Sequence, residues 1–292
     1  MKSREYVKPF RIVDGSHFRL KDFDPAETLG LKSKDHAKEA LERGIARFSR
    51  LQEKLYAQDR WGILLVLQAM DAAGKDSTIK HVMSGVNPQG CQVNSFKTPS
   101  AEELQHDFLW RTWHCLPERG KIGIFNRSYY EEVLVVRVHP ELLARESIPA
   151  QANLDNVWRR RFEDINAFEH YLSGNGFVVL KFFLHLSKKE QKRRFLERLD
   201  DPDKNWKFSM SDALERQHWE KYMRAYEEMI RNTSTKHAPW YVVPADHKWF
   251  TRLVVAEATI DALECLDLSY PKVDAEKRKE LKDARAALKH ET

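Results

Sequence analysis

The sequence predicts an α/β fold, in which a parallel sheet is buried between two layers of helices and a helical lid covers one end. Three observations support this fold. Four apolar runs have the length of strands, helical segments separate them, and the first run ends in small residues followed by Gly74 and Lys75. Near-continuous apolar strands joined through helices are typical of parallel sheets. Ligands bind such sheets at the carboxyl ends of the strands.

The elements follow in order along the chain. Residues 1–33 are mixed and turn-rich, and we expect them to form an N-terminal extension. Apolar residues then recur at helical spacing, which predicts a helix from residue 33 to about 58. The four predicted strands are residues 62–67, 121–125, 177–186 and 240–243.

A strongly basic segment follows the third strand. Residues 188–207 carry eight cations against five acids and lead through an Asp-Pro turn into a second predicted helix at 211–231. Such a hairpin is typical of a lid, which we place at about 187–231. Residues 273–292 are predicted to form a peripheral polar helix, and the whole chain, 1–292, is expected to be one domain.

Composition excludes several classes of protein. The chain of 292 residues is 32% charged, and no apolar run approaches the ~18 residues of a membrane span, so we expect no membrane partner. Its three cysteines and twelve histidines show no metal or disulfide spacing, which favours the cytoplasm. The net charge of +5 does not call for nucleic acid, which we do not expect as a partner, but it tolerates a polyanionic substrate.

Residues 64–78 have the layout of a phosphate-binding loop. Loop amides and the positive end of a helix dipole would face an anion, and the lysine adds a mobile charge. The match is incomplete, because Ala69 replaces the first glycine and Asp76 replaces the hydroxyl residue that binds magnesium. An ordinary strand-to-helix turn is the alternative. The candidate phosphate-binding residues are Ala72, Ala73, Gly74, Lys75, Asp76 and Ser77.

Two carboxylates in this segment indicate a metal. Asp71 and Asp76 would repel a phosphate unless a divalent cation lay between them. Asp71 is therefore the candidate magnesium partner, directly or through water.

A second polar group follows the second strand. Asn126 stands where a nucleoside-phosphate kinase usually has a carboxylate that organises magnesium, which leaves that task to Asp71. Arg127 can grip a phosphoryl group in a bidentate way, and its alternative role is a surface or salt-bridging residue. For Glu131 and Glu132, at the start of the next helix, the alternative is to complement the helix dipole.

The basic segment supplies candidate ligands for a chain of phosphates. Closing a lid over the loop would exclude water, which matters when hydrolysis competes with transfer. A solvated charged face is the alternative for such a run. The candidate residues are Arg193, Arg194, Arg198, Lys204 and Lys207.

Taken together, these motifs resemble the polyphosphate kinase 2 family. The similarity runs from about residue 10 to about 266, with several motifs in the same order. They are Asp71-Ala72-Ala73-Gly74-Lys75-Asp76, Asn126-Arg127-Ser128-Tyr129-Tyr130-Glu131-Glu132-Val133-Leu134-Val135-Val136-Arg137-Val138, Arg193-Arg194-Phe195, Arg198, Asp200-Asp201-Pro202, Lys204-Asn205-Trp206-Lys207 and Pro244-Ala245-Asp246-His247-Lys248-Trp249.

The resemblance implies a P-loop kinase fold of the thymidylate-kinase type. It implies reversible transfer of the terminal phosphate of inorganic polyphosphate to AMP and ADP, giving ADP and ATP, with Mg²⁺ or Mn²⁺. Asp71, Lys75 and Arg127 would be catalytic, and Asp71 would hold the metal. Asn126 and Glu131 would join the loop in binding nucleotide and phosphate. We also expect a homo-oligomer, either a dimer or a tetramer.

Departures from the family pattern indicate a branch. Many members have Asp at the position of Asn126, Asn at Glu131 and Gly at Ala69. The residues of this chain resemble the branch called class III, which uses AMP as well as ADP, and there the Glu131 position is associated with accepting the monophosphate. Ser77 stands where glycine is common, and because serine is small we expect little consequence.

Two other functions remain open at this point. A nucleoside-monophosphate kinase of the thymidylate type would share the loop, sheet and lid, but would use ATP and ignore polyphosphate. A nucleotide-binding regulator without catalysis is the other, and Asn126 in place of a carboxylate is its best argument.

Overall fold

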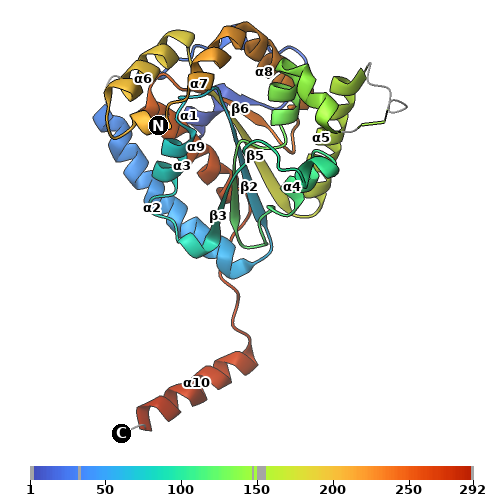
Figure 1. Ribbon diagram of the computed structural model, residues 1–292. Coiled ribbons are helices and arrows are strands. Elements are labelled where there is room, and N and C mark those ends of the chain that lie inside the picture. The colour runs from blue at the N-terminus through green and yellow to red at the C-terminus, as the bar shows by residue number, and fades with distance from the viewer. Residues whose placement is uncertain (1–2, 32–33, 147, 150–155, 291–292) are drawn as a thin grey trace.

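A central sheet of six strands in the order β1-β6-β5-β2-β4-β3 organises the molecule (Figure 1). Five strands are parallel, and β1 pairs with β6 in the antiparallel direction. The computed structural model describes residues 3–31, 34–146, 148–149 and 156–290, without the side chains of residues 3–4, 34–38 and 207. The strands are β1 (Arg11–Ile12), β2 (Gly62–Gln68), β3 (Cys91–Ser95), β4 (Ile122–Asn126), β5 (Phe177–His185) and β6 (Trp240–Pro244).

The four strands predicted from apolar runs are confirmed as β2, β4, β5 and β6. The central position of β2 explains its apolar sequence, because all seven of its residues are buried. The two edge strands were not predicted. β1 is only two residues long, and most of the five residues of β3 are exposed, so neither makes an apolar run.

Helices cover both faces of the sheet (Figure 1). On one face lie α1 (Ser3–Val7), α2 (Lys34–Gln58), α3 (Lys75–Val82) and α9 (Lys248–Glu264). On the other lie α4 (Trp110–Trp113), α5 (Val157–Gly174) and α8 (Trp219–Thr233). The predicted first long helix is confirmed as α2, while its expected start at residue 33 lies outside the described residues. The fold class is the predicted one.

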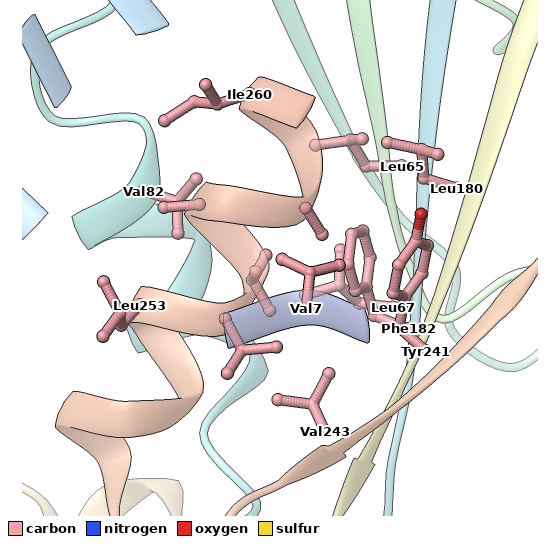
Figure 2. Packing of buried hydrophobic residues seen from close by; sticks show 14 of the residues in the cluster. Val7, Leu65, Leu67, Val82, Leu180, Phe182, Tyr241, Val243, Leu253 and Ile260 are labelled. Atoms are coloured by element: carbon pink, nitrogen blue, oxygen red, sulfur yellow. The ribbon is translucent and has the colours of Figure 1, made fainter. Parts of the chain in front are cut away.

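The N-terminal segment is part of the core. Figure 2 shows Val7 of α1 close to Phe182 and Tyr241 of the sheet, with Leu253 of α9 in the same cluster. All four side chains are less than 4% exposed. A turn-rich composition did not indicate this role, because only a few apolar residues of the segment make the contacts.

The segment predicted to be a lid differs from the expected hairpin in its second arm. It consists of α6 (Lys188–Asp200), η9 (Asn205–Lys207), α7 (Met210–Glu215), the 3-10 turn η10 (Arg216–His218) and α8. The single helix expected at 211–231 is therefore interrupted. Arg216 Nη1 donates to Lys188 O at 3.1 Å and to Gln191 Oε1 at 2.7 Å, which ties the turn to α6.

The C-terminal helix α10 (Ala275–His290) lies apart from the body, at the end of an extended segment (Figure 1). All its residues are exposed, as the prediction of a peripheral helix requires, and residues 291–292 lie outside the described part. No helix in the described part of the chain has the length and apolar character that crossing a bilayer requires. The remaining short helices are η1 (Lys8–Phe10), η2 (Leu20–Asp22), η3 (Pro88–Gly90), η4 (Glu103–Gln105), the π-helix η5 (Glu132–Val136) and η6 (Pro140–Glu146).

Candidate active site

The loop between β2 and α3 has the geometry of an anion-binding turn. Gly74 caps α3 with φ +102°, a left-handed conformation that favours glycine. The first helical hydrogen bond runs from Thr78 N to Gly74 O at 2.9 Å, and Ser77 Oγ donates to the same carbonyl. Ala72 is also left-handed, and Ala73 is buried. Amides in the first turn of a helix lack helical acceptors and can bind phosphate oxygens.

The side chain of Lys75 lies back over this loop. Its Nζ donates to the carbonyl oxygen of Ala69 at 2.9 Å. Burial lowers the pKa of Lys75, and the nearby carboxylate of Asp71 opposes that shift. An ammonium withdrawn from water gains from an anion placed beside it, because charges attract more strongly in a low dielectric.

Two side chains at the end of β4 hold the two loop carboxylates. Asn126 Nδ2 donates to Asp76 Oδ1 at 2.7 Å, and Arg127 Nη2 donates to Asp71 Oδ1 at 3.0 Å. The segments that follow β2 and β4 therefore converge at one end of the sheet. No sequence signal linked Asn126 to Asp76, because fifty residues separate them along the chain.

Arg127 adopts a backbone conformation that is uncommon for a residue with a side chain, with φ +64°. Its N–H donates to the carbonyl oxygen of Leu67 at 3.1 Å, which joins the end of β4 to β2. On the other side, Arg127 Nη1 lies 3.7 Å from Glu131 Oε2. The guanidinium thus stands between the carboxylates of Asp71 and Glu131.

Glu131 is a partly buried acid beside two cations. Burial raises its pKa, while Arg127 and Lys75 act in the opposite direction. With its amide oxygen toward Ser128, the side chain of Gln68 places its nitrogen 2.8 Å from Glu131 Oε1. The carboxylate is therefore fixed from two sides.

Arg194 differs from the expectation that it lines the path of a polyanion. Its side chain is 4% exposed, and its Nε donates to Glu190 Oε1 at 2.7 Å. Both Nη atoms donate to carbonyl oxygens at 2.6–3.0 Å, those of Ala72, Ala73, Ala245 and Asp246. Each of the five N–H groups of Arg194 thus already has a protein acceptor. Arg194 ties the phosphate loop to the segment after β6.

Arg198 connects α6 to α7. Its Nη1 lies 3.9 Å from Asp212 Oδ2 on α7. Burial raises the pKa of Asp212, and the charge of Asp71 adds to that shift. The segment predicted to be a lid contacts the loop directly, because Gln191 Nε2 on α6 donates to Asp71 O at 2.9 Å.

Two further cations of this segment, Arg193 and Lys204, lie on the outside. Arg193 is 56% exposed and bonds both oxygens of Glu190, and Lys204 pairs with Asp201. Surface ion pairs are weak, so such cations can exchange a carboxylate for a phosphate at little cost. The backbone of Lys207 lies in η9, and its side chain lies outside the described part of the structure.

A cavity of about 200 Å³ opens beside Arg127 and Glu131. The aromatic rings of Phe96, Phe108 and Tyr129 line it. Aromatic walls with a few polar groups are typical of pockets for planar ligands. Phe96 and Phe108 were not predicted from the sequence, because they lie in irregular segments without a motif.

A second charged group lines the same cavity. Glu132 and Glu146 both belong to the lining, and Arg161 on α5 bonds to each of them at 2.8 Å. Glu132 begins the helix η5, and it also bonds to Arg161 on α5. Its position in the sequence did not reveal this second contact.

The residues fit a divalent cation that is held mainly by substrate. Within residues 3–31, 34–146, 148–149 and 156–290, no three His, Cys, Asp or Glu side chains gather into a metal-ligand group. Mg²⁺ commonly keeps several waters and takes one or two carboxylates together with phosphate oxygens. Asp71, whose side chain is 32% exposed, can supply such a carboxylate.

Comparisons with known proteins agree with this geometry. The family model described as Polyphosphate kinase 2 matches residues 31–270. An ADP-polyphosphate phosphotransferase from Rhodopseudomonas palustris is 52% identical over 283 residues, covering 97% of this chain and 98% of that protein. An AMP/ADP-polyphosphate phosphotransferase from Meiothermus ruber is 45% identical over 274 residues, covering 94% and 98%.

Among solved structures, the crystal structure of Polyphosphate Kinase 2 from Arthrobacter aurescens TC1 superposes with a TM-score of 0.85 at 41% sequence identity. The superposition covers 97% of each chain. The similarity therefore extends over the loop, the cavity and the helices α6, α7 and α8 together.

Proposed function

Because the chain belongs to the polyphosphate kinase 2 family, we propose that it transfers the terminal phosphoryl group of inorganic polyphosphate to AMP and to ADP, giving ADP and ATP. One observation carries the proposal. Arg127 pairs with Asp71 of the phosphate loop and also lines the aromatic cavity. Its guanidinium therefore lies where a phosphoryl group would pass from a donor on the loop to an acceptor in the cavity.

The reaction needs no strong protein nucleophile. A phosphate oxygen of AMP or ADP attacks the terminal phosphorus of polyphosphate, and the anhydride bond to the next phosphate breaks. The shortened polyphosphate leaves with the electron pair of that bond. The acceptor oxygen is already ionised near neutral pH, so positioning and charge neutralisation dominate. One anhydride replaces another, and the reaction is reversible.

Each group of residues has a role that follows from its position in the site. Lys75 and the loop amides bind phosphate oxygens, and Arg127 stabilises charge on the moving phosphoryl group. Asp71 would hold Mg²⁺ or Mn²⁺, and the ion would supply charge neutralisation. Arg193, Arg198, Lys204 and Lys207 attract the polyphosphate chain, while Arg194 keeps the loop in place.

Glu131 supports the use of AMP. It lines the cavity and also contacts Arg127, so it reaches the phosphate end of an acceptor placed there. The Meiothermus ruber relative, named for both acceptors, supports the same conclusion. The three cysteines, which show no disulfide or metal spacing, support a cytoplasmic location, and a homo-oligomer, dimer or tetramer, stays a prediction for sedimentation analysis.

Nucleotide chromatography tests the proposal. The protein is mixed with AMP, polyphosphate and Mg²⁺, and we expect ADP first and then ATP. Glu131→Asn should reduce the rate with AMP more than the rate with ADP. Glu163→Asn, at an exposed position on α5, is the control. No ADP above a protein-free blank would reject AMP as a substrate, and equal losses with both acceptors would reject the selective role of Glu131.

A further inference from the structure

The C-terminal helix α10 carries an apolar ridge, although the helix lies apart from the body of the protein (Figure 1). Leu281, Ala284 and Leu288 are spaced three and four residues apart, so they lie on one side of the helix. Leu281 is 50% exposed and Leu288 is 67% exposed. Within the described residues, nothing in a single copy of the chain covers this ridge.

A row of cations runs beside the apolar ridge. The helix has six Lys or Arg residues against three acids. Because successive residues of a helix are about 100° apart, four of these cations lie along one flank of the ridge and the acids lie on the opposite side. The cations of this row are Arg278, Lys282, Arg285 and Lys289. The ridge is therefore apolar with a positive flank.

A groove between α4 and α5 has an apolar surface that could receive such a ridge. Trp113 of α4 is 43% exposed and Tyr171 of α5 is 55% exposed, and their ring centroids lie 5.7 Å apart. The buried ring of Phe168 lies 4.9 Å from that of Trp113 and also lines the groove. Exposed aromatic side chains that gather in a groove are typical of a surface that binds another protein segment.

The charge of the groove is opposite to that of the helix. Asp107 and Asp164 both line it. Arg161 is the cation of the lining, but its guanidinium already bonds to Glu132 and Glu146 at 2.8 Å. The groove therefore offers two carboxylates to a positively charged helix, beside an apolar surface for its leucines.

We propose that this groove binds helix α10 of a second copy of the chain, so that two copies exchange their C-terminal arms, residues 271–290. Each copy then gives one arm and receives one arm. Such a reciprocal contact has two-fold symmetry and closes on itself. Both the shape and the charge of the two surfaces agree with this occupant.

The groove of its own chain lies out of reach of the arm. The segment before the arm is tied to α2, because Gln58 Nε2 donates to Asp267 O at 3.4 Å and Tyr270 Oη donates to Glu53 Oε2 at 3.2 Å. This face of the sheet is opposite to the one that carries α4 and α5. Packed layers lie about 10 Å apart, so the two helical layers are about 20 Å apart across the sheet. The four residues between Tyr270 and α10 span at most ~14 Å, too short a path around the sheet.

The groove is also a neighbour of the cavity beside Arg127. Asp107 and Phe108 line both of them. An arm in the groove therefore contacts the wall of that cavity from the other side.

Sedimentation of the full-length protein tests the exchange. We expect the wild type to form dimers, or assemblies of dimers. Arg285→Asp places an acid against the two carboxylates of the groove, and it should raise the dissociation constant of the dimer at least ~10-fold. Asp164→Arg should do the same, because it brings a cation to the cationic row. The two changes combined in one chain restore opposite charges and should recover most of the affinity.

Two charge reversals serve as matched controls. Lys279→Asp changes a cation that lies about 160° around the helix from Leu281. Glu163→Arg changes the neighbour of Asp164, which is 63% exposed and does not line the groove. Neither should change the dissociation constant. A monomeric wild type, or constants that stay the same in Arg285→Asp and in Asp164→Arg, would contradict the proposal.

Photo-crosslinking identifies what covers the ridge. Leu288 is replaced by a photo-crosslinking amino acid, and isotopically light and heavy copies are mixed so that links between copies can be recognised. We expect links from position 288 to residues 107–113 or 164–171 of the other copy. Links to residues 275–290 of the other copy would show a pair of helices instead, and links within one copy would show an arm that folds back. Either result, or the absence of any link, would overturn the proposal.

Discussion

At the scale of single residues, the site depends on side chains that bridge two elements. Arg127 leaves β4 in a left-handed conformation, bonds the backbone of β2 and returns its guanidinium to Asp71. Strained conformations of this kind persist where the surrounding contacts fix them, and they cluster at functional sites. Here the strain places one cation between the loop and the cavity.

The sequence predicted Asp71, Lys75, Gly74 and Arg127 as one group, because loops after parallel strands meet at one edge. It could not predict the environment of Arg194. An arginine in a basic run is expected to be solvated, and its burial depends on carbonyl oxygens more than fifty residues away along the chain. Such acceptors leave no pattern in the local sequence.

Removing either loop charge should abolish turnover without unfolding the protein. Lys75→Ala removes a cation from the phosphate site, and Asp71→Asn removes the charge that holds the metal. Each should lower kcat at least ~100-fold, equivalent to about 2.7 kcal/mol of barrier. Asp283→Asn on the exposed helix α10 serves as the control for charge loss. If Asp71→Asn retains normal rates and metal dependence, the cation is held by other groups.

Because the pKa of Glu132 is raised, the free energy of unfolding should decrease as pH rises. Burial raises its pKa from 4.5 to about 8, so between these values the folded state holds a proton that the unfolded state has lost. Folded protein then binds more protons, and the free energy of unfolding falls as pH rises through this window. Glu132→Gln cannot ionise, and urea titrations should show its stability relative to wild type increasing over the same range. A difference that stays constant with pH would contradict this account.

At the scale of elements, a buried network joins β5, α5 and α8 behind the site. Lys181 and Glu169 are both fully buried, and Lys181 Nζ donates to Glu169 Oε2 at 2.6 Å. Glu169 Oε1 accepts hydrogen bonds from Tyr129 and Tyr130 at 2.8 Å. The turn that carries Arg127 and Glu131 is therefore anchored to the core through its two tyrosines.

Breaking this pair should destabilise the protein strongly. Lys181→Met leaves a buried carboxylate unpaired and should cost about 3–5 kcal/mol in urea unfolding. Adding Glu169→Gln removes that charge, so the double variant should be more stable than Lys181→Met alone. Lys121→Met breaks a matched Lys–Glu pair at the surface and should cost far less than Lys181→Met. A double variant no more stable than the single one would show that the unpaired charge is not the cause.

The lid should contribute to polyphosphate binding through its charge. A chain of phosphates releases counterions when cations bind it, so the apparent KM should rise with salt. Arg198→Ala and Lys207→Ala should raise this KM and flatten its salt dependence, with a smaller effect on the KM for AMP. Lys279→Ala on α10 is the control. Unchanged constants and slopes at two salt concentrations would remove the lid from the substrate path.

At the scale of the whole molecule, the parallel sheet explains why distant segments form one site. The segments after β2, β4 and β6 lie at the same end of the sheet, and α6 contacts those after β2 and β6. Apolar runs predicted this arrangement because the central strands are buried. The edge strands and α1 were not predicted, because few of their residues are apolar. Their positions depend on contacts with the rest of the fold.

The central claim is that polyphosphate, rather than ATP, is the phosphoryl donor to a nucleotide held beside Arg127. The most direct test is the initial rate of ADP formation from AMP and Mg²⁺ with either polyphosphate or ATP as the only donor. We predict rapid ADP formation with polyphosphate and little with ATP, and loss of the polyphosphate reaction in Lys75→Ala. ADP formation that requires ATP and ignores polyphosphate would contradict the account and assign the chain to the nucleoside-monophosphate kinases.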